Sequence, residues 1–259
     1  LFINGQPFLT SILRNIKYRT VQPLPDQGKQ SIANALTELI SLMNRAGFKV
    51  KQFHSDNAFQ AVAQIITAKY GIEFNMANPQ EHVPEIERSN RVIKERVRAA
   101  FHLLPFSKLP KVLVRYLVMD STKKINFFPP KGGISKYYSP HLIITRRPVD
   151  YNKHLLHPFG TYVQAHTEPD PSNTLQPRTL DCIYLRYNDN QQGGHELLDL
   201  RTGAIIKRRT VTAVPMTQQV IDLVHAMADS EGMPEGLKIE TKSGIILYNS
   251  SWIEEEEVE

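Results

Sequence analysis

The alternation of hydrophobic and polar residues predicts strands and helices in turn over the first part of the chain. Asn4-Gly5 has the composition of a tight hairpin turn between two apolar runs, and Gly47 is a typical helix stop. The predicted elements are strands within 1–24, a helix over 30–46, a strand over 48–56, a helix over 59–71 and a strand over 72–77. This order predicts a mixed sheet with flanking helices, which is an α/β fold.

A longer helix, predicted over 83–104, carries two neighbouring stripes of side chains. One stripe is apolar and consists of Ile86, Ile93, Val97, Ala100 and Leu104. The other begins with a carboxylate and continues with cations, and consists of Glu87, Arg91, Lys94 and Arg98. A carboxylate can hold a metal ion and the cations can hold a phosphate backbone, so this face is a candidate for nucleic-acid chemistry.

The second half of the chain changes in character. Residues 126–158 are basic and rich in proline and glycine, which is typical of a linker. From residue 159 short apolar runs alternate with turn residues, which predicts a small β-rich, barrel-like module with one helix and an acidic tail. The predicted domains are therefore a core over 1–125, a linker over 126–158 and a module over 159–259.

Composition limits the class of protein, and charge indicates a partner. Hydrophobic residues make up 41% and charged residues 22%, as in ordinary globular proteins, and no apolar run is long enough to span a bilayer. The single cysteine, Cys182, favours a reducing compartment. Between Arg88 and Lys153 there are 15 Lys and Arg against 3 acidic residues, a local net charge of +12. This favours a polyanionic partner, although a solvated charged surface is the alternative.

Two acidic residues are the candidate metal ligands, and each has an ordinary alternative role. Asp56 alone is more typical of a turn or a helix cap, and Glu87 alone is more typical of a surface acid in a first helical turn. A helix and a strand separate them in the sequence, an order that can bring both carboxylates to one sheet edge, where Mg²⁺ or Mn²⁺ ions could be shared. Glu85 is the competing acid, but it lies across the apolar stripe from the cations, so Glu87 is preferred.

Two other features have more than one interpretation. Phe127 and Phe128, before a proline pair, could stack on bases, although local packing is more typical of such a pattern. His54, beside the predicted strand end, could contact a phosphate, although a hydrogen-bonded structural histidine is more common.

Several of these segments resemble one family of proteins. The segment HSDN followed by NPQEHVPEIERSNRVIKE resembles the integrase core of copia-type LTR retrotransposons. Downstream, HPFGTYVQAH, DCIYLRY and GGHELLDLRTGAIIKRRTVTAVP resemble the region that follows this core in the same Gag-Pol polyproteins. The resemblance implies an RNase H-like fold with an Asp-Asp-Glu triad. Asp56 and Glu87 would be its second and third catalytic and metal-binding acids, and Arg91 and Lys94 would lie where cations grip DNA ends, with Arg98 extending their stripe.

The resemblance also implies an activity and a setting. The parent polyprotein would process and join DNA 3′ ends with Mg²⁺ or Mn²⁺, act as a homo-oligomer on element ends and target DNA, and work in the nucleus or in a cytoplasmic virus-like particle. The first acid of the triad has no counterpart here, so the two-metal site would be incomplete. We therefore expect a polyprotein fragment that binds nucleic acid, and whether it is an enzyme stays open. A non-catalytic or host-adopted DNA-binding remnant and an RNase H-like nuclease are the alternatives.

Overall fold

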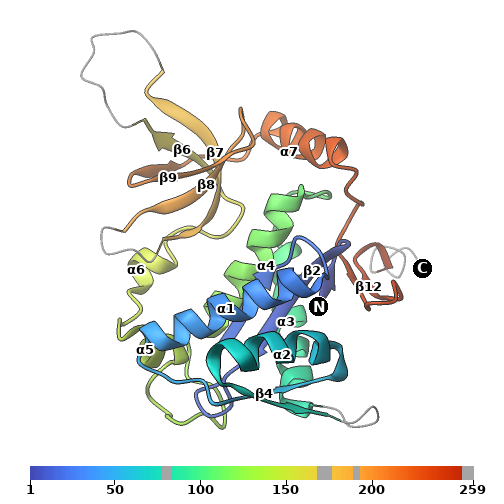
Figure 1. Ribbon diagram of the computed structural model, residues 1–259. Coiled ribbons are helices and arrows are strands. Elements are labelled where there is room, and N and C mark those ends of the chain that lie inside the picture. Colours follow the sequence, from blue (N-terminus) through green and yellow to red (C-terminus); the bar gives the residue numbers. More distant parts are fainter. Residues whose placement is uncertain (78–82, 168–176, 189–192, 253–259) are drawn as a thin grey trace. The chain divides into compact units, whose positions relative to one another are not determined.

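The computed structural model describes residues 1–77, 83–167, 177–188 and 193–252, which form two compact units (Figure 1). Unit 1 consists of Leu1–Arg96, Ser121–Pro148 and Ile239–Leu247, and unit 2 of Val97–Asp120, Val149–Lys238 and Tyr248–Glu259. The division falls within two helices, α3 (Pro84–Phe101) and α4 (Lys111–Ile125). None of the helices in the described ranges combines the length and apolar content that crossing a membrane requires.

An antiparallel sheet in the order β12-β11-β1-β2-β3 carries both ends of the described chain. Its strands are β1 (Phe2–Ile3), β2 (Gln6–Ile12), β3 (Arg19–Pro23), β11 (Lys238–Glu240) and β12 (Ile246–Asn249). The predicted hairpin turn between β1 and β2 is confirmed, since Asn4 and Gly5 have φ values of 47° and 72°. Such a turn needs positive φ at both positions, which Asn and Gly tolerate best. Strands β11 and β12 join this sheet through antiparallel pairing of β11 with β1, although their residues lie in the segment predicted as the module.

Two helices cover a second, smaller sheet in unit 1. Helix α1 (Lys29–Arg45) and helix α2 (Gln60–Tyr70) bury apolar faces in one core with parallel strands β4 (Gln52–Ser55) and β5 (Glu73–Met76). Strand β4 begins at Gln52, later than predicted, and the Phe48 N–H donates to the Met43 carbonyl at the end of α1. The mixed α/β composition is confirmed, with parallel and antiparallel pairings in separate sheets among the described residues.

Helix α3 buries the centre of the predicted apolar stripe, since Ile93 and Val97 have no exposed surface. Ile86 and Ala100 are partly buried, and the helix ends at Phe101, before Leu104 and earlier than predicted. The segment predicted as a linker holds two short helices, α5 (Pro140–Thr145) and α6 (Tyr151–His154). Each begins with a side-chain cap: Ser139 Oγ accepts from the Leu142 N–H, and Asp150 Oδ1 accepts from the Asn152 N–H. Such caps satisfy backbone donors at a helix start, so the sequence did contain a signal for both helices.

Unit 2 is built on a second antiparallel sheet in the order β10-β6-β7-β8-β9 (Figure 1). Its strands are β6 (Tyr162–His166), β7 (Thr179–Tyr187), β8 (His195–Asp199), β9 (Ile205–Arg208) and β10 (Val211–Ala213), and α7 (Gln218–Ser230) follows. Strands β9 and β10 lie at opposite edges, yet two residues join them. That link spans at most about 11 Å, whereas the edges of a flat five-stranded sheet lie about 19 Å apart. The sheet is therefore curled, as the predicted barrel-like module requires.

Candidate nucleic-acid interface

Asp56 lies directly after β4, at the carboxyl end of the parallel pair β4–β5, and its side chain is exposed. Its Oδ1 accepts a hydrogen bond from the Ala58 N–H at 3.1 Å and caps the short 3₁₀ helix Asn57–Phe59. The cap role that the sequence left open is therefore present. A carboxylate has about four acceptor sites, and one cap bond leaves the others exposed to solvent and to a ligand.

Glu87 lies in the first turn of α3, and its side chain is exposed. Its backbone N–H donates to the Val83 carbonyl at 3.2 Å, so the residue is part of the first hydrogen-bonded turn. A negative charge at this position interacts favourably with the helix dipole. The placement of Glu87 at a helix start is the one predicted from the sequence.

Glu85, the competing acid, forms ion pairs with Arg14 and Lys17. Its two carboxylate oxygens accept hydrogen bonds from Arg14 Nε and Lys17 Nζ, both at 2.7 Å. These bonds hold the pKa of Glu85 below its usual range. Arg14 and Lys17 belong to the connection between β2 and β3, so Glu85 ties the start of α3 to that connection. Two carboxylates two residues apart thus have different partners.

Lys94 and Asp56 act on the same point of unit 1, the amino group of Leu1 beside β1. Each residue has a resolved electrostatic interaction with the Leu1 nitrogen, where Lys94 opposes and Asp56 favours a positive charge. Lys94 is half-buried, and burial lowers its own pKa. Asp56 and Lys94 therefore both lie within electrostatic range of the start of β1. Glu87 is two helical turns from Lys94, about 10 Å along the helix axis.

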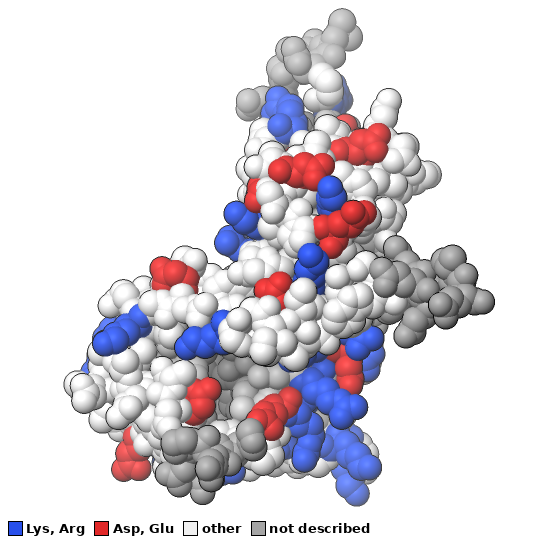
Figure 2. Space-filling view, turned by 90° about the vertical axis from the view of Figure 1, so that its right-hand side faces the viewer, with Lys and Arg blue, Asp and Glu red and all other residues white. Residues whose placement is uncertain are grey.

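The two arginines of the predicted stripe have different surroundings. Arg91 is exposed and donates from Nε to Glu95 Oε1 at 2.9 Å, one turn along the same helix. The guanidinium of Arg98 lies over the Tyr248 ring, 4.1 Å from its centroid, and His102 Nε2 lies 2.8 Å from the Tyr248 hydroxyl. Figure 2 shows a dense group of Lys and Arg side chains in the lower right of the view. Helix α3 carries five cations, which are Arg88, Arg91, Lys94, Arg96 and Arg98.

Metal-ligand geometry adds no further site. Across residues 1–77, 83–167, 177–188 and 193–252, no group of three or more His, Cys, Asp or Glu side chains could hold a metal ion. Asp56 and Glu87 supply oxygen donors of the kind that Mg²⁺ and Mn²⁺ take, and their shared use of a metal stays a prediction. His54 lies beside this end of β4, with Nδ1 3.4 Å from the Asn75 side-chain nitrogen.

The sequence is similar to that of a known transposon protein. It is 26% identical over 206 residues to the retrovirus-related Pol polyprotein from transposon TNT 1-94 of Nicotiana tabacum. The match covers 74% of this chain but only 15% of that polyprotein. The predicted resemblance to a retrotransposon Pol polyprotein is therefore confirmed. The chain spans a small part of the relative that it matches.

No protein-family model matches the chain. Among solved structures, the catalytic core domain of BIV integrase aligns with 55% of this chain and 88% of its own, at 19% identity and a TM-score of 0.41. A likeness this loose carries no argument about function.

Proposed function

We propose that this chain is the nucleic-acid-binding part of an integrase core from a copia-type retrotransposon Pol polyprotein. Its parent activity would be metal-dependent processing of DNA 3′ ends and strand transfer on an RNase H-like fold. The observation that carries this proposal is the position of Asp56 and Lys94 around the start of β1. Both residues interact electrostatically with the Leu1 nitrogen, and this supports a shared surface for a strand-end carboxylate and a helix cation. The similarity to a transposon Pol polyprotein supports the same conclusion.

Each residue of this surface has a defined task in the proposal. Arg91, Lys94 and Arg98 neutralise successive phosphates of a duplex and position it without reading its sequence. Asp56 and Glu87 supply carboxylate oxygens as metal ligands. A bound Mg²⁺ or Mn²⁺ would polarise a phosphoryl oxygen there. Glu85 binds Arg14 and Lys17 and has no part as a metal ligand in the proposal.

The metal ligands can be tested by titrating Mn²⁺ into the protein and following bound ion by electron paramagnetic resonance. We expect weak binding, since two carboxylates form a partial set of ligands, and weaker binding still in Asp56→Asn and in Glu87→Gln. Glu85→Gln is the matched control, because it removes an equal charge two residues away, and it should leave Mn²⁺ affinity nearly unchanged. Tight binding that survives Asp56→Asn would show that the ions lie elsewhere.

Labelled duplex ends distinguish the proposed parent activity from its alternatives. Joined products with Mn²⁺ would indicate strand transfer, and cleavage without joining would indicate a nuclease. Binding of duplex that ignores metal and yields neither product would indicate a DNA-binding remnant. The assay requires only the 259-residue chain and a chain extended upstream along the polyprotein.

We also propose a setting for this activity. Residues 1–125 would act as the core, 126–158 as a linker and 159–259 as a following module. The parent protein would act as a homo-oligomer on element ends and target DNA, in the nucleus or in a virus-like particle. Size measurement on the parent polyprotein with and without DNA ends would test the oligomer.

A further inference from the structure

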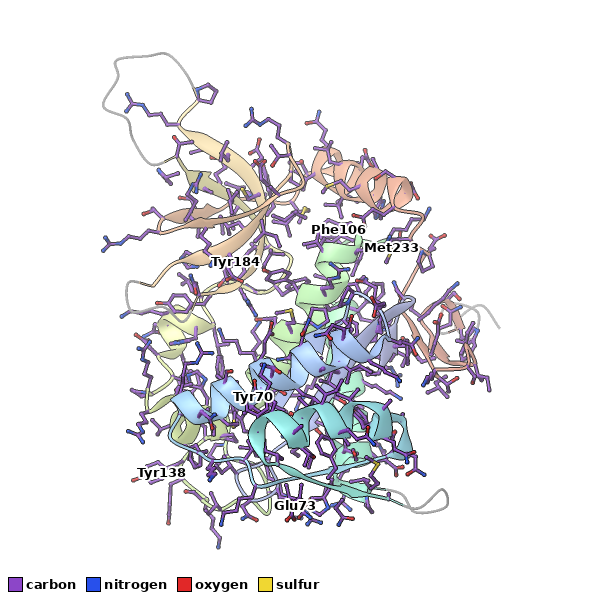
Figure 3. The ribbon with its side chains drawn as sticks, in the orientation of Figure 1. Tyr70, Glu73, Phe106, Tyr138, Tyr184 and Met233 are labelled. Atoms are coloured by element: carbon purple, nitrogen blue, oxygen red, sulfur yellow. The ribbon has the colours of Figure 1, made fainter. Side chains whose placement is uncertain are left out.

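One segment of unit 1, residues 128–138, presents aromatic rings and lysines to solvent, and we name it the aromatic platform. Tyr137 is 88% exposed, Tyr138 60% and Phe128 52%. Lys131 and Lys136 are also exposed. Tyr138 lies at the lower left margin of the view in Figure 3. Exposed rings in this density mark a binding surface, because isolated apolar residues are ordinary on a protein surface and clusters of them are not.

Hydrogen bonds fix the backbone beneath these rings. Ser135 Oγ accepts from the N–H groups of both Tyr137 and Tyr138, at 3.1 and 2.9 Å. The Ile134 N–H donates to the Asn15 carbonyl at 3.0 Å, which ties the platform to the connection between β2 and β3. The platform is therefore ordered before any partner arrives, and less conformational entropy is lost on binding.

The platform also begins and ends at anchored points. Phe127 is buried and packs edge-on against His141 with ring centroids 5.1 Å apart. The Asn126 side chain accepts from the Arg19 N–H and donates to the Arg19 carbonyl, both at 2.8 Å. Of the two phenylalanines left open by the sequence, Phe127 therefore packs locally, while Phe128 is half exposed.

The charge around the platform selects the partner. From Ser121 to Val149 the sequence has no acidic residue and six Lys and Arg. A positive surface attracts a polyanion, and exposed rings need flat apolar faces to stack on. Single-stranded nucleic acid has both, whereas a duplex keeps its base faces inside the stack. An acidic peptide would satisfy the lysines but would leave the rings in water.

We propose that the aromatic platform binds single-stranded nucleic acid, with bases stacked on Tyr137 and Tyr138 and phosphates held by Lys131 and Lys136. This surface lies outside the acids and cations of the proposed duplex site. The inference does not rest on the proposed function, since it needs neither metal nor a triad. It adds a second nucleic-acid interface, selective for unpaired bases.

The test measures the affinity of the 259-residue chain for fluorescein-labelled oligo(dT) and for a hairpin duplex of the same length by anisotropy. Each stacked base that is lost weakens binding about 5- to 100-fold, so Tyr137→Ala/Tyr138→Ala should weaken oligo(dT) binding by at least about 20-fold. Tyr137→Phe/Tyr138→Phe keeps the rings and should bind as the wild type does. Trp252→Ala removes an exposed aromatic residue of unit 2 and should have no effect.

Salt dependence separates stacking from charge. Removing two phosphate contacts from a single strand lowers the log–log salt slope by about 1.4, so Lys131→Ala/Lys136→Ala should flatten the slope by that amount. Tyr137→Ala/Tyr138→Ala should weaken binding with an unchanged slope. Circular dichroism checks that each variant keeps the fold.

A reporter observes the stacking directly. Tyr137→Trp in a Trp252→Phe background places the single tryptophan on the platform, and oligo(dT) should quench its fluorescence. Unchanged oligo(dT) affinity in the folded Tyr→Ala variant would overturn the inference and leave a protein partner as the explanation of the exposed rings. An equal loss for hairpin and single strand would also overturn it. Arg91→Ala/Lys94→Ala should affect the hairpin alone, so failure of the duplex site is seen separately.

Discussion

Unit 2 and the candidate interface of unit 1 use the same kinds of polar residue at opposite degrees of burial. In the sheet of unit 2, His195, Glu196 and Asp199 are 8%, 6% and 4% exposed. In unit 1, Asp56 and Glu87 are exposed. His195 packs against the ring of Tyr184, labelled in Figure 3, with ring centroids 5.6 Å apart.

This difference separates stability from binding. A buried charge must be paired, so its partners contribute to the free energy of folding. An exposed charge contributes little to folding and retains capacity for a ligand. Changes in unit 2 should therefore alter stability, and changes at the interface of unit 1 should alter binding at nearly constant stability. The predictions below test this separation.

The largest effect is expected at Glu196, whose buried carboxylate accepts a hydrogen bond from Arg186 Nε at 2.6 Å. Arg186→Ala leaves this charge without its main partner, and we expect a loss of about 3 kcal/mol in the free energy of unfolding. Urea unfolding measures it. The matched control is Lys207→Ala, because Lys207 lies 3.8 Å from the same carboxylate and is 66% exposed. It should cost about 1 kcal/mol or less. Equal losses in the two variants would show that burial does not set the strength of these pairs.

The second effect concerns pH. His157 and His195 have ring centroids 5.8 Å apart, and burial lowers the pKa of both imidazoles below the ordinary 6.5. Below pH 6.5 the unfolded chain takes up protons that the folded chain does not, so stability should fall as the pH decreases from there. Thermal unfolding between pH 7.5 and about 5 measures this dependence.

Two variants test whether the buried histidine pair causes the pH dependence of stability. His157→Phe should reduce it, because the new ring does not titrate, and His54→Phe is the control at an exposed histidine of unit 1. If the two variants respond to pH alike, the buried pair is not the cause.

The smallest effect is expected at the first turn of α3. Glu85→Gln breaks two ion pairs of a side chain that is 31% exposed, and we expect a loss of about 1 kcal/mol. Glu87→Gln, two residues away, should change stability by only a few tenths of a kcal/mol. Urea midpoints of the two variants provide the comparison. A greater loss in Glu87→Gln would assign the structural role to Glu87 and weaken its assignment as a ligand.

Local pattern was enough to predict most elements of the fold. The Asn4-Gly5 turn, the Gly stops of α1 and α2, and the buried positions Ile93 and Val97 follow from short-range rules of turn, cap and period. The caps Ser139 and Asp150 carried an equally local signal for α5 and α6, although the segment was predicted as a linker. The prolines and glycines of this segment indicated a linker more strongly than the two caps indicated helices.

Long-range pairing could not be predicted from the sequence. Glu85 binds Arg14 and Lys17, which lie about 70 residues earlier in the sequence, and β11 pairs with β1, which lies at the other end of the chain. Such partners depend on tertiary placement, for which a single sequence carries no periodic signal. The candidate site was predicted as residue types on a strand end and a helix face. Its division into the anchored Glu85 and the exposed Glu87 required the structure.

The central claim is that the cationic face of α3 binds duplex nucleic acid, and the salt dependence of duplex binding tests it most directly. Each lost phosphate contact lowers the log–log slope by about one unit, so Arg91→Ala/Lys94→Ala should flatten it by about two and weaken all sequences alike. Lys238→Ala/Lys242→Ala is the control with an equal change of charge, and its slope should match the wild type. Equal flattening in both double variants would contradict the account, because binding would then follow total charge and not this helix.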